Sequence, residues 1–588
     1  MTATTSTRPR QLFAQRPGRT VGGLVFRVGY ADETLPTSGT TALVVALALR
    51  AVERPGLEIS ASVGPTVTHV QVSATDERVR TTLRELTRAL ADLPVRHRET
   101  ETRALDERAD DVVVQPWRFG LRGYGLGPGQ LLGLHRVTDD DLRAWAREKF
   151  TGTNAVAWVT GETALDLDLA LPAGRAATTA SPPEVPGPVT PLPAEALAGG
   201  NRVMWDAVVP DGPALAVFAE VARRALFQGL RQDHGWTYDV SIMIGALDGQ
   251  QASLQIAAGL RPETATQATG EFLDTLGRLR FAVATDELES ARAHLLAAYG
   301  EPHQDAMWLT DDAVLTLLGR PVPTPAQRRA ALAQVTAADV VSLARQVWDA
   351  GLLVTPVASG WAGTEPVRRG AGEPVTGKAF ERIDVDATIR VGEPGVTLRD
   401  GRRTTTIRFE EAAALIVYPD GGRLLIGLDG ARVPFEPTLH DDLRATDLAG
   451  LVDDHLDGAL VVPVSRPAAP ERPDQEEIKQ ASQTRAAREV EEDGLLRTTG
   501  LAALAAGKVV VVLALVLVLL AGVGGTVFAA ATLLASVGSL LDGELDWSVP
   551  ALLVPAGLAC AGVTWLAYRA ILRMGGESAG KKESADQG

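Results

Sequence analysis

Cysteine and histidine are both scarce in this chain. Its 588 residues include one cysteine, Cys560, so an internal disulfide framework is excluded. Eight histidines occur, and no two of them lie within five residues of each other, which excludes a helical pair of zinc-binding histidines. No glycine-rich loop ends in the Gly-Lys-Ser/Thr of a phosphate-binding site. The net charge of −16 argues against a nucleic-acid surface, so we expect no nucleic-acid partner.

Charge is missing altogether from two stretches near the C-terminus. No charged residue occurs from Val509 to Leu541 or from Val549 to Tyr568. A bilayer core needs about 20 apolar residues of helix, so region 501–573 predicts two transmembrane helices, at about 509–536 and 549–570. Basic residues flank the pair and only acids lie in the connecting loop. This pattern predicts a multi-pass cell-membrane protein whose soluble domains, both termini and tail 574–588 are cytoplasmic.

Three segments rich in proline, glycine or charge divide the remaining chain. We interpret 176–197, 363–378 and 465–500 as linkers, and 1–19 as a disordered N-terminus, because none has the apolar residues to form a core. The domains predicted between them span 20–175, 198–362 and 379–464.

The first two of these domains repeat the same pattern. Each begins with an apolar strand and a helix, followed by two alternating strands and another helix. Each also closes similarly, in VTDDDLRAWAREKFTGTNAVAWVTGE and in VTAADVVSLARQVWDAGLLVTPVASG. The repetition predicts an internal duplication and an α+β fold class.

The same residues resemble a known family. LRQDHGWTYDVSIMIGALDGQQASLQIAAG, followed by TDELESARAHLLAAY, is similar to the C-terminal half of M16 metallopeptidases, the insulinase and mitochondrial processing peptidase-like family. VGYADETLPTSGTTALVVALAL resembles that family's N-terminal half. The resemblance implies two related halves, each an antiparallel sheet covered by helices, which face each other across a substrate chamber.

The zinc site that the resemblance implies is missing. Active members carry H-x-x-E-H on the first helix, where two histidines bind zinc and the Glu acts as general base. Here Ala42 and Ala46 stand at the histidine positions and Val45 at the base. Glu107 is the best match to the third ligand, but alone it binds no metal, and we interpret it as a solvated helix glutamate. We therefore expect no catalytic residue, no metal and no cofactor.

One functional element of the family remains in the second half. By the resemblance, Arg231 and Tyr238 correspond to a pair that holds the substrate carbonyl. Here they would retain peptide binding without a nucleophile. In the alternative interpretation, Arg231 pairs with a carboxylate and Tyr238 packs between the halves.

Residues 379–464 form a separate module. Short alternating strands separated by EPG, RDG, PDGG and LDG turns precede one helix, a pattern similar to a small β-barrel of the pleckstrin-homology (PH) or GRAM type. Its basic cluster, Arg399, Arg402 and Arg403, predicts contact with anionic membrane lipids. A solvated hairpin tip is the alternative.

Together these features predict a membrane-anchored, catalytically inactive M16-like protein. It would bind a polypeptide or an M16-like partner subunit on the cytoplasmic face, and a homo-oligomer is compatible with the sequence. Two alternatives remain open. One is a zinc-dependent M16-type endopeptidase with divergent ligands or one completed in trans, and the other is a scaffold for a membrane complex.

Overall fold

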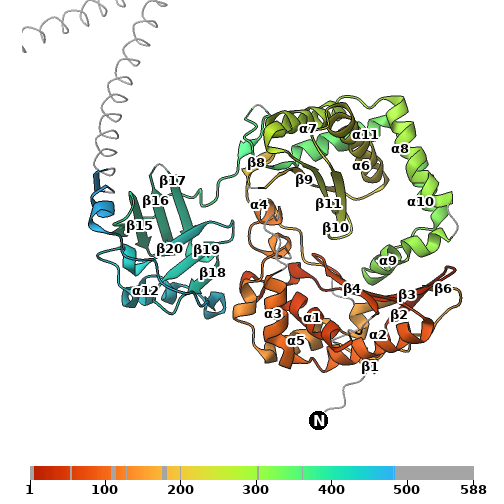
Figure 1. Ribbon diagram of the computed structural model, residues 1–588, viewed down its shortest axis with the longest axis horizontal. Helices are drawn as coiled ribbons and strands as arrows, with labels where there is room; N and C mark the ends of the chain where they lie inside the picture. Colours follow the sequence, from red (N-terminus) through yellow and green to blue (C-terminus); the bar gives the residue numbers. More distant parts are fainter. Residues whose placement is uncertain are drawn as a thin grey trace, which may run out of the picture. The chain divides into compact units, whose positions relative to one another are not determined.

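The computed structural model (Figure 1) describes residues 6–52, 54, 56–107, 114–127, 129–174, 182–198, 200–300, 303–360, 362–401, 403–480 and 482–483. One compact unit comprises Met1–Gln475, and a second begins at Glu476. Both predicted transmembrane helices lie outside the described residues.

The first half contains a five-stranded sheet in the order β2-β6-β3-β5-β4. Alternating buried residues in β5 reflect the period-two pattern of a strand that has one face on the core. Helices α1, α2 and α5 enclose the same core, which includes Leu24, Leu43 and Leu83. The elements are β2 (Arg10–Gln15), β3 (Thr20–Phe26), α1 (Thr40–Val52), β4 (Glu58–Val63), β5 (Thr68–Ala74), α2 (Asp76–Ala91), α3 (Arg98–Asp106), α5 (Asp139–Lys149) and β6 (Ala155–Gly161).

The second half repeats this topology. Its sheet has the order β10-β11-β9-β12-β8-β13, so β8 to β12 match β2 to β6 strand for strand. In both halves the first strand pairs in parallel with the last, and the other equivalent pairs are antiparallel. The elements are β8 (Ala194–Leu197), β9 (Arg202–Pro210), α6 (Pro213–Leu226), β10 (Val240–Ala246), β11 (Gln251–Gly259), α7 (Ala265–Leu279), α8 (Thr285–Ala297), α11 (Ala337–Asp349), β12 (Leu352–Thr355) and β13 (Glu365–Pro366).

Each half begins with one more strand than the sequence pattern indicates. Strand β2 lies within the segment 1–19, and a short strand β1 (Ser6–Thr7) precedes it, so the interpretation of that segment as disordered is wrong there. Strand β8 lies within the predicted linker 176–197, and β13 within the predicted linker 363–378. All three carry few apolar residues or sit in proline-rich sequence, so their pairing depends on distant partners and not on local pattern.

The helices that close the two halves begin with the same cap. The Thr138 hydroxyl accepts the Asp141 N–H, and the Thr336 hydroxyl accepts the Asp339 N–H, both at 3.2 Å. Each aspartate carboxylate accepts the threonine N–H in return at 2.8 Å. These reciprocal capping boxes satisfy backbone donors that the helix itself leaves free.

A helix of the second half completes the first half. α9 (Gln304–Leu317) packs on β6 and β2, where Leu309, Ala313 and Leu317 join Val25 and Trp158 in one buried cluster. α10 (Pro325–Gln334) then leads back to α8 and α6. The halves are therefore interlocked by packing within one compact unit.

The segment after the second half folds into two four-stranded sheets around one core. The first has the order β14-β15-β16-β17 and the second β20-β19-β18-β21. Buried residues of both sheets and of the short helix α12 (Ala445–Leu451) form one cluster. The strands are β14 (Lys378–Glu381), β15 (Ala387–Gly392), β16 (Gly395–Asp400), β17 (Arg403–Arg408), β18 (Ala412–Val417), β19 (Arg423–Gly427), β20 (Arg432–Phe435) and β21 (Val461–Pro463). We call this segment the β-module.

The third predicted linker begins later than residue 465. The Arg466 guanidinium binds the carboxylates of Asp420 (2.5 Å) and Glu436 (2.7 Å), and the Thr438 hydroxyl donates to the Pro470 carbonyl at 2.8 Å. Residues up to about Pro470 are thus attached to the β-module.

Among the described residues, one helical stretch has the length and hydropathy of a membrane span. It is Leu35–Val52, and 67% of it is buried inside the protein. Its leucine and valine side chains from Leu43 to Val52 belong to or pack on the core of the first half, which accounts for its apolar composition.

Candidate functional site

The start of α1 is held by a buried carboxylate. Glu33 accepts the backbone N–H groups of Gly39 (2.8 Å) and Thr41 (2.7 Å), which are among the donors that the first helical turn leaves unpaired. These two bonds favour the charged form of Glu33, but loss of water outweighs them. Burial therefore raises the pKa of Glu33 to about 7.

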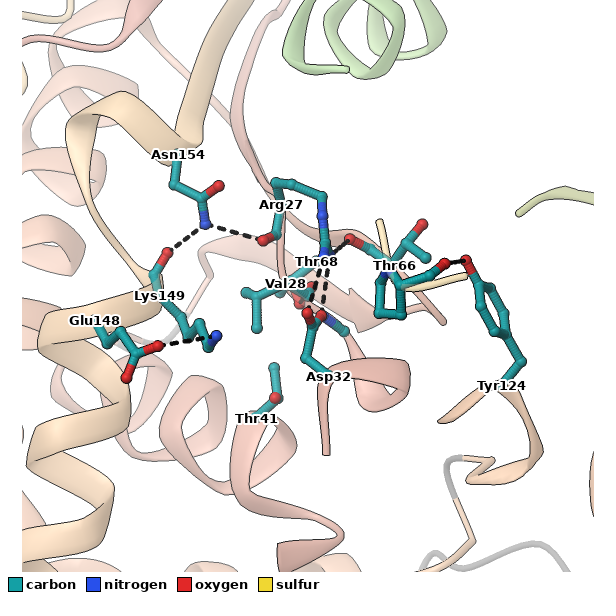
Figure 2. A network of polar contacts seen from close by, with 12 residues as sticks. Arg27, Val28, Asp32, Thr41, Thr66, Thr68, Tyr124, Glu148, Lys149 and Asn154 are labelled. Atoms are coloured by element: carbon teal, nitrogen blue, oxygen red, sulfur yellow. Dashed lines mark hydrogen bonds and ion pairs between the residues drawn. The ribbon is translucent and has the colours of Figure 1, made fainter. Parts of the chain in front are cut away.

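A buried ion pair fixes the loop before Glu33. The Arg27 guanidinium bonds both carboxylate oxygens of Asp32, at 2.8 and 2.9 Å, and also donates to the Thr66 carbonyl at 2.7 Å. Figure 2 shows the Arg27 guanidinium turned toward both partners. The Thr66 hydroxyl then donates to the Leu247 carbonyl of the second half at 3.3 Å. The polar groups around the start of α1 thus serve the backbone and the contact between the halves.

The helix face expected to bind zinc does not fit the ion. Ala42 and Ala46 are half-buried and offer only methyl groups, while Val45 is 5% exposed and belongs to the core of the first half. Glu107 is exposed at the end of α3. Within the described part of the chain, no three His, Cys, Asp or Glu side chains are grouped closely enough to hold a metal. No metal-dependent step can be built from these residues.

Arg231 and Tyr238 lie together on the second half. Arg231 lies in the last turn of a π-helix, Phe227–Asp233, that continues α6, and its guanidinium donates to the Thr237 carbonyl at 3.1 Å. Tyr238 is 71% exposed, so it does not pack between the halves. Its ring lies 5.4 Å from the Arg231 guanidinium carbon and 4.4 Å from that of Arg261, in cation–π contact with both.

The strand that follows Tyr238 has a free edge. β10 pairs with β11 on one side and with no strand on the other, within the described chain. Met243 and Ile244 are consecutive and point to opposite faces, yet they are 59% and 44% exposed. β10 thus presents unpaired backbone groups beside exposed apolar side chains, next to the Arg231–Tyr238–Arg261 cluster.

The sequence pattern missed two of the residues in these sites. Arg261 could have been found from the register of the β10–β11 hairpin. Val240 lies opposite Ala258, and two residues further along this antiparallel pair residue 260 lies opposite Tyr238. Arg261 is the next residue. Glu33 had no such signal, since its role depends on burial and on a helix that begins seven residues later.

The predicted lipid-facing cluster is described only in part. Arg399 and Arg403 lie in the hairpin β16–β17, where Arg403 is exposed and pairs across the strands with Asp400. Arg402 lies outside the described residues.

Comparison with known proteins places the fold. No family model matches the chain, and no curated protein matches it. A protease from Helicobacter pylori is similar over 60% of this chain and 98% of its own, at 14% identity and a TM-score of 0.50. An inactive M16 peptidase domain from Pseudomonas fluorescens matches 61% of this chain and 99% of its own, at 13% identity and a TM-score of 0.49.

Likeness at such low identity bears on the fold alone. The Helicobacter pylori protease, at a TM-score of 0.50, shares with this chain a mixed α+β fold whose sheets are covered by helices. The predicted α+β halves are confirmed at that level.

Proposed function

We propose that this protein binds an extended polypeptide, or a partner subunit that presents one, along β10 without hydrolysing it. The observation that carries the proposal is the free edge of β10 beside Tyr238, which Arg231 and Arg261 hold in an exposed position. A free strand edge can pair with a polypeptide backbone of any sequence, while Met243 and Ile244 offer apolar contacts to alternate side chains.

The proposed lack of hydrolysis is supported by the first half. The side chains of Ala42, Val45 and Ala46 supply neither a metal ligand nor a general base. We further propose that helices at 509–536 and 549–570 anchor the chain with its soluble part in the cytoplasm, and that the β-module faces lipid through Arg399, Arg402 and Arg403. Resistance of the chain to alkaline extraction from membranes tests the anchor.

Peptide binding can be measured on the purified full chain in a nonionic detergent. The probe is a fluorescein-labelled polypeptide that stays unfolded, followed by anisotropy. Tyr238→Ala should weaken its binding about tenfold, as expected for loss of an exposed aromatic contact. Phe281→Ala is the matched control, because Phe281 is 75% exposed beside Arg280, just after the end of α7. Equal binding by Tyr238→Ala and the unmodified protein would refute the proposed role of Tyr238.

Metal analysis tests the alternative activity. Stoichiometric zinc in the purified protein, together with peptide cleavage that a chelator abolishes, would replace the binding proposal with a zinc endopeptidase. Retained partner capture after substitution of both Arg231 and Tyr238 by alanine would instead favour a scaffold.

A further inference from the structure

Three arginines, Arg369, Arg403 and Arg432, lie on segments that are joined where the second half meets the β-module. The Gly370 carbonyl accepts the Thr406 N–H of β17 at 2.8 Å, and the Gly370 N–H donates to the Asp429 carboxylate at 2.5 Å. These bonds attach the segment that contains Arg369 to β17, which begins at Arg403, and to the turn before β20, which begins at Arg432.

The Arg369 guanidinium is held in place between an aromatic ring and a glycine. It lies 3.7 Å from the ring centroid of Trp117, a residue of α4 (Gln115–Phe119). On the other side it approaches Gly430, where an added Cβ would stand 3.1 Å from the guanidinium carbon. The buried Nε of Arg369 has no hydrogen-bond acceptor in the described structure. The guanidinium is therefore held beside Trp117 and Gly430 with its Nε unsatisfied, and a bound anion would accept from its terminal nitrogens.

The electrostatics around Arg369 agree with this geometry. Burial, followed by repulsion from Arg432 and Arg403, lowers the pKa of Arg369 to about 10, and Asp429 opposes the shift. Both oxygens of Asp429 already accept backbone N–H groups, from Gly370 and from Ala431. Asp429 therefore offsets only part of the positive charge.

Three other arginines of the same region are paired with carboxylates. Arg382, Arg423 and Arg466 each bind at least one carboxylate. In the described structure, Arg369, Arg403 and Arg432 form no ion pair, although the whole chain carries 73 acidic residues against 57 basic ones. Like charges gathered without counter-ions are unfavourable, and a bound anion would relieve the repulsion.

We propose that Arg369, Arg403 and Arg432 form a binding site for a phosphate group. Guanidinium groups donate paired hydrogen bonds to phosphate oxygens, and three of them on neighbouring elements can surround one phosphate. This site shares only Arg403 with the predicted cluster at the hairpin tip, and it does not depend on polypeptide binding at β10. Because Arg369 and Trp117 belong to segments outside the β-module, the bound phosphate would brace the junction among three segments.

Calorimetric titration of the full chain in nonionic detergent with inorganic phosphate tests the site. The double variant Arg403→Gln/Arg432→Gln should bind phosphate at least about tenfold more weakly, because two of three charge-assisted contacts are lost. Arg390→Gln is the control, since Arg390 is an exposed arginine of β15 in the same module. It should change the affinity by less than about twofold. Both arginines of the double variant are exposed, so an unchanged melting temperature verifies its fold.

A second titration distinguishes the sources of the phosphate. Detergent micelles that contain a phosphatidylinositol phosphate are compared with micelles that contain phosphatidylcholine. Tighter binding to the phosphoinositide micelles than to inorganic phosphate assigns the site to a lipid headgroup, whereas equal binding assigns it to a soluble phosphate compound. No saturable response to either probe, or an equal loss of binding in Arg390→Gln, overturns the proposal.

Discussion

The two halves share one strand order but place their polar groups differently. The first half buries them, in the Arg27–Asp32 pair and in the carboxylate of Glu33 at the start of α1. The second half also buries Asp206, but it exposes Arg231 and Tyr238 where α6 gives way to β10. Sheets, closing helices and caps are similar in both copies, whereas these polar groups lie at different junctions of the repeat, between β3 and α1 in the first half and between α6 and β10 in the second. The difference indicates that the first half supplies a rigid support and the second half the accessible surface.

The largest expected effect concerns a buried ion pair that joins α4 (Gln115–Phe119), in the first half, to β9 in the second. Arg118 and Asp206 are each 3% exposed at the side chain, and Arg118 also donates to the Ala350 carbonyl at 2.8 Å. Arg118→Ala leaves a buried carboxylate without its partner and should cost about 3–5 kcal/mol of unfolding free energy. Urea denaturation of the full chain in detergent measures it.

Arg202→Ala provides the control for that substitution. Arg202 lies in the same strand as Asp206, but its ion pair with Asp239 is about half exposed, so the loss should stay below about 1 kcal/mol. Similar losses in the two variants would contradict the distinction between a buried support and an exposed surface.

The next effect concerns Glu33 and pH. Because the folded state raises the Glu33 pKa from 4.5 to about 7, it binds more protons than the unfolded state between these values. Stability should therefore be greatest below pH 4.5 as far as Glu33 is concerned, and should fall by up to about 3 kcal/mol as the pH rises to 7. Glu33→Gln should flatten this slope in melting curves recorded across the window. An unchanged slope in that variant would assign the pH dependence to other groups.

The smallest effect tests whether the halves are equivalent where they look alike. Thr138→Ala and Thr336→Ala each remove a threonine that caps the closing helix of its half. Each should lower stability by about 1 kcal/mol, and the two losses should add in the double variant because the sites are separate. Thermal melting of the three variants measures this. Unequal losses would show that the two caps contribute different free energies to the stability of the protein.

Local sequence pattern accounts for the repeat and little of its long-range pairing. The hairpin β4–β5 and the closing helices follow from alternation and from Val-Thr-x-x-Asp caps, which act over a few residues. The sequence pattern did not predict β2 and β8, because their pairing partners, β6 and β12, lie more than a hundred residues away. The packing of α9 on the first sheet is likewise set by tertiary contacts.

The candidate sites show the same limit. Arg231 and Tyr238 could be selected through the family resemblance, but the contact of Tyr238 with Arg261 required the register of the β10–β11 hairpin. The proposed phosphate site consists of Arg369, Arg403 and Arg432, which lie up to 63 positions apart in the sequence (432 minus 369). No local motif connects them.

The composition of β10 has a practical consequence for work with the purified protein. Its sequence, VSIMIGA, contains no proline, no lysine and no other charge, the features by which exposed sheet edges are normally kept from joining one another. Two molecules could align these strands and merge their sheets. We expect the protein to self-associate as its concentration rises, and a lysine at Ile244 to be the simplest way to keep it dispersed.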